Sequence, residues 1–386
     1  MTIELSRCYH HDHCDPTDRE AVSFLKQVLS FIHPHLFTIT DMKNEIVSLT
    51  SIRGVFAIYV VLYHMASHWN QFFRNGYLSV DLFFILSGFI MSYVYHDVFS
   101  AKIKKENTIK FYISRISRIY PLYIALTFVL ICVSISLEEF SWPDAVANIF
   151  FIQVFFGNAM IGPSWSLSAE IIAYALFPFL FILVKNNKIK SLATSLLCLL
   201  TIFIIGLQTP GTNGPFDISK GWGAILRCIS EYAIGVYAYL FIFNECKFVI
   251  GSKYIDAFSL LILSLLLVNN IDLIVISLFV LYIPVIARSD ESSITGKLLS
   301  LKIMHYLGEI SYSIYLWHTI ILRQFRLEFE SVNGMITQNK NLVIVIMFIQ
   351  IIIISMISYH FIEKPAKKIT VKHLTKMINK KEKLQV

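Results

Sequence analysis

The composition of the chain excludes most classes of soluble protein. Its 386 residues would suffice for roughly two or three soluble domains, yet 56% of them are hydrophobic and only 15% are charged. The mean hydropathy of +0.63 is typical of an integral membrane protein. The net charge of +7 gathers in linkers between apolar segments, which favours membrane topology over nucleic-acid binding.

Residues 1–46 are interpreted as a separate polar extension ahead of the first apolar segment. Apolar residues recur there at helical spacing, which indicates a helix on the membrane surface: Val22, Leu25, Leu29 and Ile32. Metal-ligating residue types cluster near its start, at Cys8, His10, His11, His13 and Cys14. Their spacing matches no standard zinc finger, so we favour a solvated tail and expect no metal.

From residue 47 onward, apolar segments alternate with short polar linkers, and their lengths predict about ten membrane spans. The predicted spans are 54–70, 77–96, 119–136, 168–184, 191–207, 222–243, 255–270, 272–287, 305–325 and 342–362. A shorter segment, 145–160, is predicted to be re-entrant or interfacial, because the charge pattern leaves it no crossing. The fold class is therefore expected to be all-α, a polytopic transmembrane helical bundle.

Lysine and arginine predict the orientation of the chain. They concentrate in the linkers 97–118 and 185–190 and in the tail after Glu363, whereas the alternate linkers carry few. Because cytoplasmic linkers are rich in these residues, we expect both termini in the cytoplasm. We expect residues 47–366 to form the transmembrane domain and 367–386 a basic cytoplasmic tail.

The apolar segment that begins near Arg53 carries His64 deep inside it. The two residues are close to three helical turns apart, so both side chains share one face, roughly 16 Å apart along the axis. An ionisable group at membrane depth marks a functional site by default, although His64 could simply hydrogen-bond a neighbouring helix. Asp81 and Glu170 lie in the same outer half on other predicted spans, where the three groups could converge.

Asp81 and Glu170 each have a structural alternative. Asp81 could accept hydrogen bonds from backbone amides near the start of its span, and Glu170 could reach water among the headgroups. Arg227 and Glu231 lie four residues apart on a later span, so the simplest prediction for them is an intrahelical ion pair.

Three arginines are predicted to gather on the cytoplasmic side. Arg115 and Arg118 are three residues apart just before a proline, and Arg53 lies at the inner end of its own span. Anchoring to anionic headgroups would explain such residues. Arginine is also suited to bidentate recognition of phosphate, so we favour a role in binding an anion.

Six motifs follow one another between about residues 47 and 366. They are Arg53 and His64 with ten residues between them, GYLSVDLFFILSGF at 76–89, FYISRISRIYPLY at 111–123, WSLSAE at 165–170, GEISYSIYLWH at 308–318 and FIEKP at 361–365. Together and in this order they resemble the acyltransferase 3 family, integral-membrane enzymes that move acyl groups from acyl-coenzyme A to sugars and other acceptors. Two positions depart from the family pattern: Ile171 replaces a frequent second acid, and Thr319 replaces a frequent aromatic residue.

The resemblance, combined with the map of polar residues, implies a site for each substrate. Arg53, Arg115 and Arg118 would hold the phosphates of acyl-coenzyme A, with acetyl-coenzyme A favoured as the donor. The acyl arm would then run toward His64, the expected general base, while Asp81 or Glu170 would hold its tautomer.

A covalent acyl-enzyme on His64, Ser166 or Ser168 is the alternative to direct transfer. Trp165, Ser168 and His318 are the expected acceptor-binding residues, although His318 could equally pack at an interface.

The expected partners are the lipid bilayer and a saccharide or glycolipid acceptor, with no nucleic acid. The rival function is a transporter or flippase of a glycolipid or a small anionic substrate. The sequence shows no inverted repeat and no pair of broken helices of the kind that transporters use, so we favour the enzyme.

Overall fold

The computed structural model describes part of the chain, namely residues 45–67, 71–100, 104–156, 158–185, 187–208, 214–246, 251–331, 340–370 and 372–373. The chain divides into two compact units, Met1–Asn44 and Glu45–Val386, and every described residue belongs to the second. The predicted surface helix, the cysteine and histidine cluster at 8–14 and most of the basic tail lie outside the described residues.

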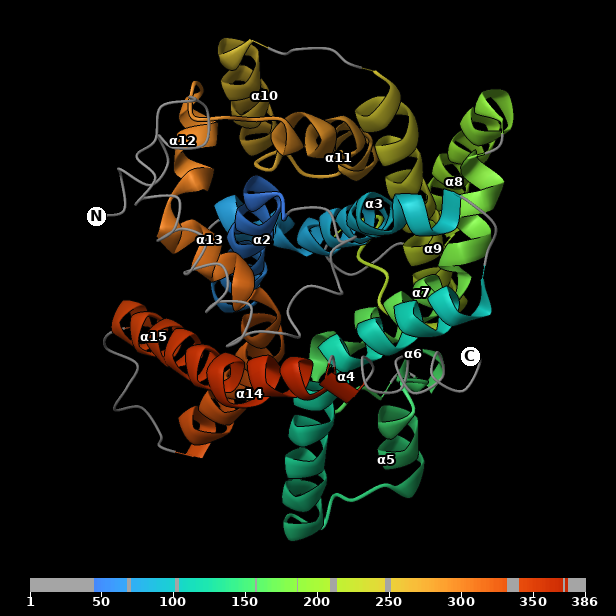
Figure 1. Ribbon diagram of the computed structural model, residues 1–386. Coiled ribbons are helices and arrows are strands. Elements are labelled where there is room, and N and C mark those ends of the chain that lie inside the picture. The colour runs from blue at the N-terminus through green and yellow to red at the C-terminus, as the bar shows by residue number, and fades with distance from the viewer. Residues whose placement is uncertain are drawn as a thin grey trace, which may run out of the picture. The chain divides into compact units, whose positions relative to one another are not determined.

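All elements of the described residues are helices, which confirms the predicted all-α class (Figure 1). Seven segments among these residues are long and apolar enough to cross a membrane. They are formed by α2 (Val47–Ala66), η2 with α3 (Gln71–Leu78, Ser79–Ser100), α4 (Lys105–Ser136), η3 with α7 (Gly162–Ser164, Trp165–Lys185), α8 (Lys188–Gln208), α9 with η4 (Gly221–Tyr237, Ala238–Glu245) and α15 with η6 (Lys340–Ser358, Tyr359–Glu363). Each coincides with a predicted span, but the predicted total of about ten is not confirmed.

The other three predicted spans are shorter or broken in the structure. A helix needs about 20 residues to cross the hydrocarbon core, and neither of the first two reaches that length. They are α10 (Ser252–Leu265), with 14 residues, and α11 (Asp272–Ala287), with 16 residues. The segment predicted at 305–325 is divided between two helices that follow α12 (Ile294–Ser300), namely α13 (Lys302–Glu309) and α14 (Ser311–Ser331).

The segment predicted to be re-entrant or interfacial contains two short helices, α5 (Trp142–Ile149) and α6 (Gln153–Phe156). Asn148 is fully buried and supports the irregular backbone beyond α5. Its Nδ2 donates to the carbonyl of Asn158 at 2.9 Å, and its Oδ1 accepts from the backbone amide of Met160 at 3.1 Å. Neither helix is long enough to cross a membrane, as the sequence predicted.

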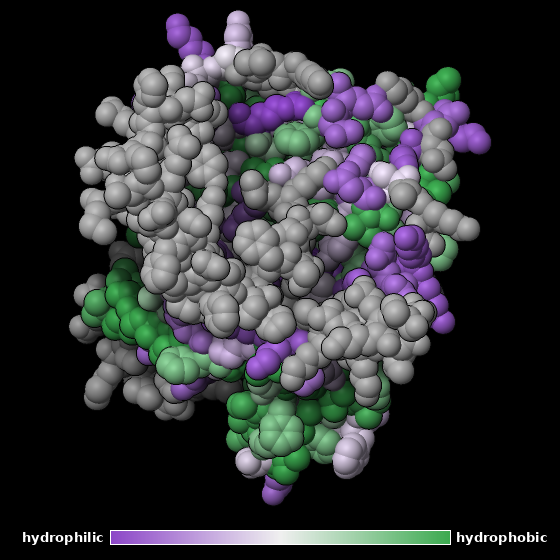
Figure 2. Space-filling model, viewed as in Figure 1, coloured by the Kyte–Doolittle hydropathy of each residue, from purple (hydrophilic) through white to green (hydrophobic). Residues whose placement is uncertain are grey.

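Large apolar side chains lie exposed on the outward faces of several long helices. Figure 2 shows hydrophobic surface over α15 and over the lower parts of α4 and α5. The exposed side chains include Phe128, Val133, Phe179, Ile349 and Ile353. Apolar surface of this extent, distributed over spanning helices, is explained by contact with lipid.

Glycines bring the backbones of α3 and α9 into contact. A Cβ atom on Gly88 would lie 2.0 Å from the carbonyl oxygen of Tyr232, and a Cβ on Gly235 would lie 2.0 Å from that of Ile85. No side chain fits at either position. Small residues therefore set the distance between two helices that carry buried charges, as is common in membrane bundles.

We expect Gly235→Ala to destabilise the protein by about 1–3 kcal/mol, because the added methyl group must push α3 and α9 apart. The measurement is thermal unfolding of the full chain in detergent. Gly251→Ala is the matched control, since a Cβ there meets only the Tyr254 ring at 3.5 Å. Equal melting temperatures for the two variants would contradict the close packing of α3 on α9.

Candidate active site

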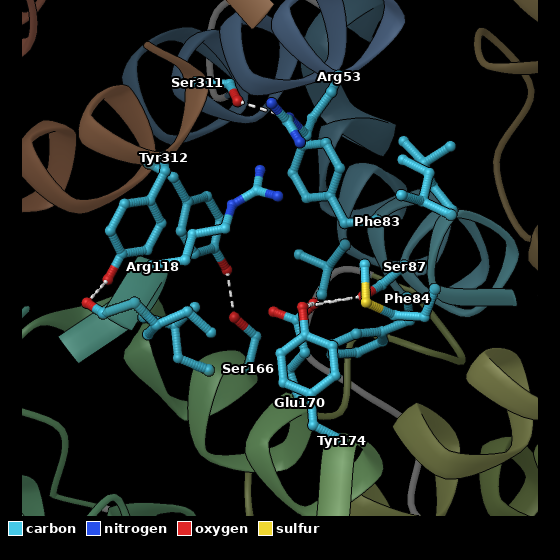
Figure 3. A pocket seen from close by; sticks show the side chains of 17 residues that line it. Arg53, Phe83, Phe84, Ser87, Arg118, Ser166, Glu170, Tyr174, Ser311 and Tyr312 are labelled. Carbon is cyan, nitrogen blue, oxygen red and sulfur yellow. Dashed lines mark hydrogen bonds between the residues drawn. The ribbon is translucent and has the colours of Figure 1, made fainter. Parts of the chain in front are cut away.

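A cavity opens between α2, α3, α4, α7 and α14 (Figure 3). Arg53 of α2 and Arg118 of α4 line one part of it, and Ser166, Glu170 and Tyr315 line another. The remaining walls are largely apolar and aromatic. A largely apolar cavity with cations in one part suits a ligand that has an anionic head and an uncharged arm.

The two cavity arginines differ in how they are held. Arg53 Nε donates to Ser311 Oγ at 2.9 Å, and its Nη2 donates to the carbonyl of Gly308 at 2.8 Å, so its guanidinium is fixed. Arg118 is exposed and has no hydrogen-bond partner among the described residues. Figure 3 shows both guanidinium groups directed into the cavity. Like charges that face one space repel each other, and a bound anion would relieve that repulsion.

Arg115 does not join Arg118 in the cavity, in contrast to the expected pair. It is buried against α3, where its Nη1 lies 3.3 Å from Met91 Sδ and its guanidinium lies 5.6 Å from the centre of the Tyr95 ring. Three residues turn a helix by about 300°, so the two side chains leave α4 in directions about 60° apart. This offset places Arg118 in the cavity and Arg115 behind its wall.

Glu170 lies in the cavity wall with two hydroxyl donors. Ser87 Oγ donates to Glu170 Oε1 at 2.7 Å, and Tyr174 Oη donates to the same oxygen at 2.6 Å. Both partners also line the cavity. The structure therefore places Glu170 with Ser87 and Tyr174 and gives it no hydrogen bond to His64.

Asp81 has a different partner from the one that we expected. Arg227 of α9 donates to both of its carboxylate oxygens, from Nε at 2.9 Å and from Nη2 at 2.6 Å. The predicted Arg227–Glu231 pair is present with a longer separation of 3.5 Å. All three side chains are buried. Asp81 therefore neutralises Arg227 and does not hold the His64 imidazole, because its oxygens are directed to another helix.

His64 donates its Nδ1 hydrogen to its own helix. The Nδ1 atom lies 2.9 Å from the carbonyl oxygen of Val60, which can only accept. The proton therefore resides on Nδ1, and Nε2 keeps a lone pair that can take another proton. His64 is exposed and lies outside the lining of the cavity. The acidic side chain that acts on it electrostatically is Asp217, which the sequence analysis had not selected.

His318 of α14 is a close titratable neighbour of His64 on another helix. The ring centres are 5.0 Å apart. His318 is fully buried, its Nδ1 lies 3.2 Å from the carbonyl of Ile314, and its Nε2 has no hydrogen-bond partner among the described residues. Tyr315 packs on it with ring centres 5.8 Å apart. Because Tyr315 also lines the cavity, it stands between that cavity and the two histidines.

A buried glutamine fixes the start of α7, where the cavity ends. Gln153 Nε2 donates to the carbonyl of Ser164 at 3.1 Å. Ser166 Oγ donates to the carbonyl of Pro163 at 2.9 Å and lies 2.7 Å from Tyr315 Oη. The non-spanning segment thus supports the cavity wall through side-chain contacts to an irregular backbone.

The other expected acceptor residues lie behind this wall. Trp165 packs edge-on against Phe84 and lies under the Arg227 guanidinium, 5.8 Å from it. Ser168 is fully buried, and its Oγ has no partner among the described residues. Neither residue lines the cavity, whereas Ser166 does. In the described residues, no group of three or more histidine, cysteine or acidic side chains could hold a metal.

Comparison with known proteins identifies relatives of the chain. A family model for an acyltransferase domain, acyltransferase 3, matches residues 46–360. The O-acetyltransferase OatA of Staphylococcus aureus is 27% identical over 360 residues, which cover 83% of this chain and 57% of the relative. The peptidoglycan O-acetyltransferase OatA of Listeria monocytogenes is 26% identical over 376 residues, which cover 84% and 56%.

The chain thus spans less than two thirds of the length of these relatives. No solved structure matches it. The family model covers most of the chain and includes both cavity arginines and both histidines. The chain belongs to the acyltransferase 3 family.

Proposed function

We propose that this protein is a membrane O-acyltransferase that moves an acyl group from cytoplasmic acyl-coenzyme A to a hydroxyl of a saccharide or glycolipid. Acetyl-coenzyme A is the favoured donor. The observation that carries the proposal is the cavity, which has two arginine guanidinium groups in one part and is separated from two adjacent histidines by the Tyr315 side chain. Relatives named O-acetyltransferase support the acetyl group, and one named for peptidoglycan supports a saccharide acceptor.

In this proposal the donor enters from the side of Arg53 and Arg118. Their guanidinium groups bind the phosphates of coenzyme A, since arginine matches phosphate geometry with paired hydrogen bonds. Arg115, one helical turn away, adds positive charge without contact. The uncharged arm then follows the apolar cavity toward Ser166 and Tyr315.

His64 acts as the general base on the acceptor. Its Nε2 takes the hydroxyl proton, the acceptor oxygen attacks the thioester carbonyl carbon, and the carbon–sulfur bond breaks. Asp81 and Glu170 contribute indirectly in this scheme. Asp81 holds α3 to α9 through Arg227, and Glu170 keeps Ser87 and Tyr174 in the cavity wall.

The acceptor would approach on the exposed side of His64, next to His318. Trp165 and Ser168, the other expected acceptor-binding residues, lie behind the cavity wall and are assigned no contact with the acceptor in this scheme. We place the protein in a cell or inner membrane with both termini in the cytoplasm. Support comes from contacts at the α13–α14 junction: Arg53, near the start of the first span, donates to Gly308, and Ser313 donates to Glu363, near the end of the last. These contacts join the start of the first span to the end of the last through one short junction, and an even number of crossings would put both ends at one membrane face.

Single cysteines in a cysteine-free background test this topology. We expect a cysteine at Lys105 to react with a membrane-impermeant maleimide only after the cells are permeabilised. One at Glu139, beyond the other end of α4, should react in intact cells. The reverse pattern would contradict the proposed orientation.

The donor site is tested by Arg118→Ala. Loss of a charged hydrogen-bonding group of this kind costs about 1.5–3 kcal/mol, so we expect the KM for acyl-coenzyme A to rise at least about tenfold. Lys105→Ala is the control, because Lys105 is on the same helix, exposed and outside the cavity. An unchanged donor KM in the arginine variant would show that Arg118 is a headgroup anchor.

The base is tested by His64→Gln. We expect the variant to insert and to bind acyl-coenzyme A, yet to transfer at least about 100-fold more slowly, since glutamine can hydrogen-bond but cannot accept the proton. The measurement is kcat at saturating donor in the purified full chain. Near-normal transfer would exclude His64 as the base.

A further inference from the structure

We propose that His318 is a second catalytic residue, which delivers a proton to the sulfur of coenzyme A as the thioester breaks. This inference rests on the proposed acyl transfer and adds the leaving-group half of the reaction. It assigns His318 a role different from the acceptor binding that the sequence suggested.

The first observation is that both histidines are in the same tautomer. Each directs Nδ1 to the carbonyl four residues earlier in its own helix, Val60 for His64 and Ile314 for His318. The Nε2 atoms are therefore the free ones. The rings lie 5.0 Å apart, so a proton can pass between the two Nε2 atoms with a small ring movement or one bridging water.

The second observation is that the two imidazoles face different surroundings. His64 is exposed, as a base that meets an acceptor from outside the bundle must be. His318 is fully buried, and Tyr315, which packs against it, lines the donor cavity and lies 2.7 Å from Ser166 Oγ. His64 thus lies on the exposed side, where the acceptor is proposed to bind, and His318 lies on the side of the donor cavity.

The third observation is that His318 Nε2 has no partner among the described residues. A buried nitrogen without a hydrogen bond costs about 1–3 kcal/mol, so structure alone gives no reason to keep it. A thiolate that forms away from water is also costly, because a charge in a low-dielectric interior lacks solvation. Protonation of the sulfur by His318 removes that charge.

The proton balance closes with these two residues. His64 Nε2 takes the proton from the acceptor hydroxyl, whose oxygen bonds to the acyl carbon. The electron pair of the broken carbon–sulfur bond stays on sulfur. The proton passes from His64 to His318 Nε2 and then to that sulfur, which leaves coenzyme A with a neutral thiol and both imidazoles neutral.

The test compares two donors in the purified full chain. The two donors differ in their leaving groups. The thiolate that departs from acetyl-coenzyme A requires a proton, whereas the p-nitrophenolate that departs from p-nitrophenyl acetate is a much weaker base and leaves without one. We expect His318→Gln to lower kcat with acetyl-coenzyme A by about 100-fold, with the donor KM within about threefold of wild type. With p-nitrophenyl acetate the loss should shrink to a few-fold.

His64→Gln should be slow with both donors, and His360→Gln is the matched control on another helix. An equal loss with both donors, or a raised acceptor KM with unchanged kcat, would overturn the proposal for His318. If the wild type transfers nothing from acetyl-coenzyme A, the proposed function fails instead, which keeps the two failures distinct.

A measurement on the unaltered chain covers the case in which His318→Gln does not fold. The rates of acetyl transfer from a series of acetyl thioesters are compared with the acidity of the departing thiol. General-acid catalysis predicts a weak dependence, because the enzyme supplies the proton. A steep dependence would show that the sulfur leaves unprotonated and would overturn the role of His318.

Discussion

The ion pair between Asp81 and Arg227 is the interaction on which the rest of the structure depends. It joins α3 to α9 through two hydrogen bonds inside an apolar bundle, and Trp165 of α7 covers the guanidinium. Charges in such surroundings must be paired, and removal of one partner typically costs about 3–5 kcal/mol because the other is left uncompensated. The pair therefore fixes the relative positions of three helices, two of which form walls of the cavity.

A second constraint, the spacing along α2, separates Arg53 from His64, the proposed base. Arg53 and His64 are on one helix, close to three turns apart, so whatever binds at the arginine must reach along the helix to meet the histidine. The cavity provides the first part of that path, and Tyr315 occupies the boundary. A long thin donor with a charged head fits such an arrangement better than a compact substrate that crosses the membrane.

The sequence predicted the helical class, the positions of the seven helical segments that are long and apolar enough to cross a membrane, and the non-spanning segment, because these follow from apolar length and from glycine and proline. It also predicted the Arg227–Glu231 pair, which depends only on spacing within one helix. It did not identify Asp81 as the closer partner of Arg227, because that contact joins residues far apart in the chain. The sequence did contain one signal for this contact. Arg227 has the acid Glu231 one turn away on its own helix, and Asp81 is a second acid inside an apolar segment that needs a cationic partner.

The same limit applies to the site. Arg115 and Arg118 leave α4 in directions about 60° apart, but which of the two enters the cavity depends on how α4 packs, with Arg115 held against Met91 and Tyr95. The proximity of His64 and His318 depends on how α2 and α14 pack, which no periodicity reveals. Helix ends such as the break between α13 and α14 likewise depend on tertiary contacts. The sequence therefore predicted one continuous span at 305–325, where the structure has two helices.

Turnover of the donor is the most direct test of the central claim, since it does not depend on which acceptor is used. Purified full chain in detergent is given acetyl-coenzyme A labelled in the acetyl group, and release of free thiol is followed together with the position of the label. We expect the donor to be consumed, slowly with water and faster with a saccharide that takes up the label. A correctly folded protein that moves glycolipid across a membrane while leaving the thioester intact would contradict the account.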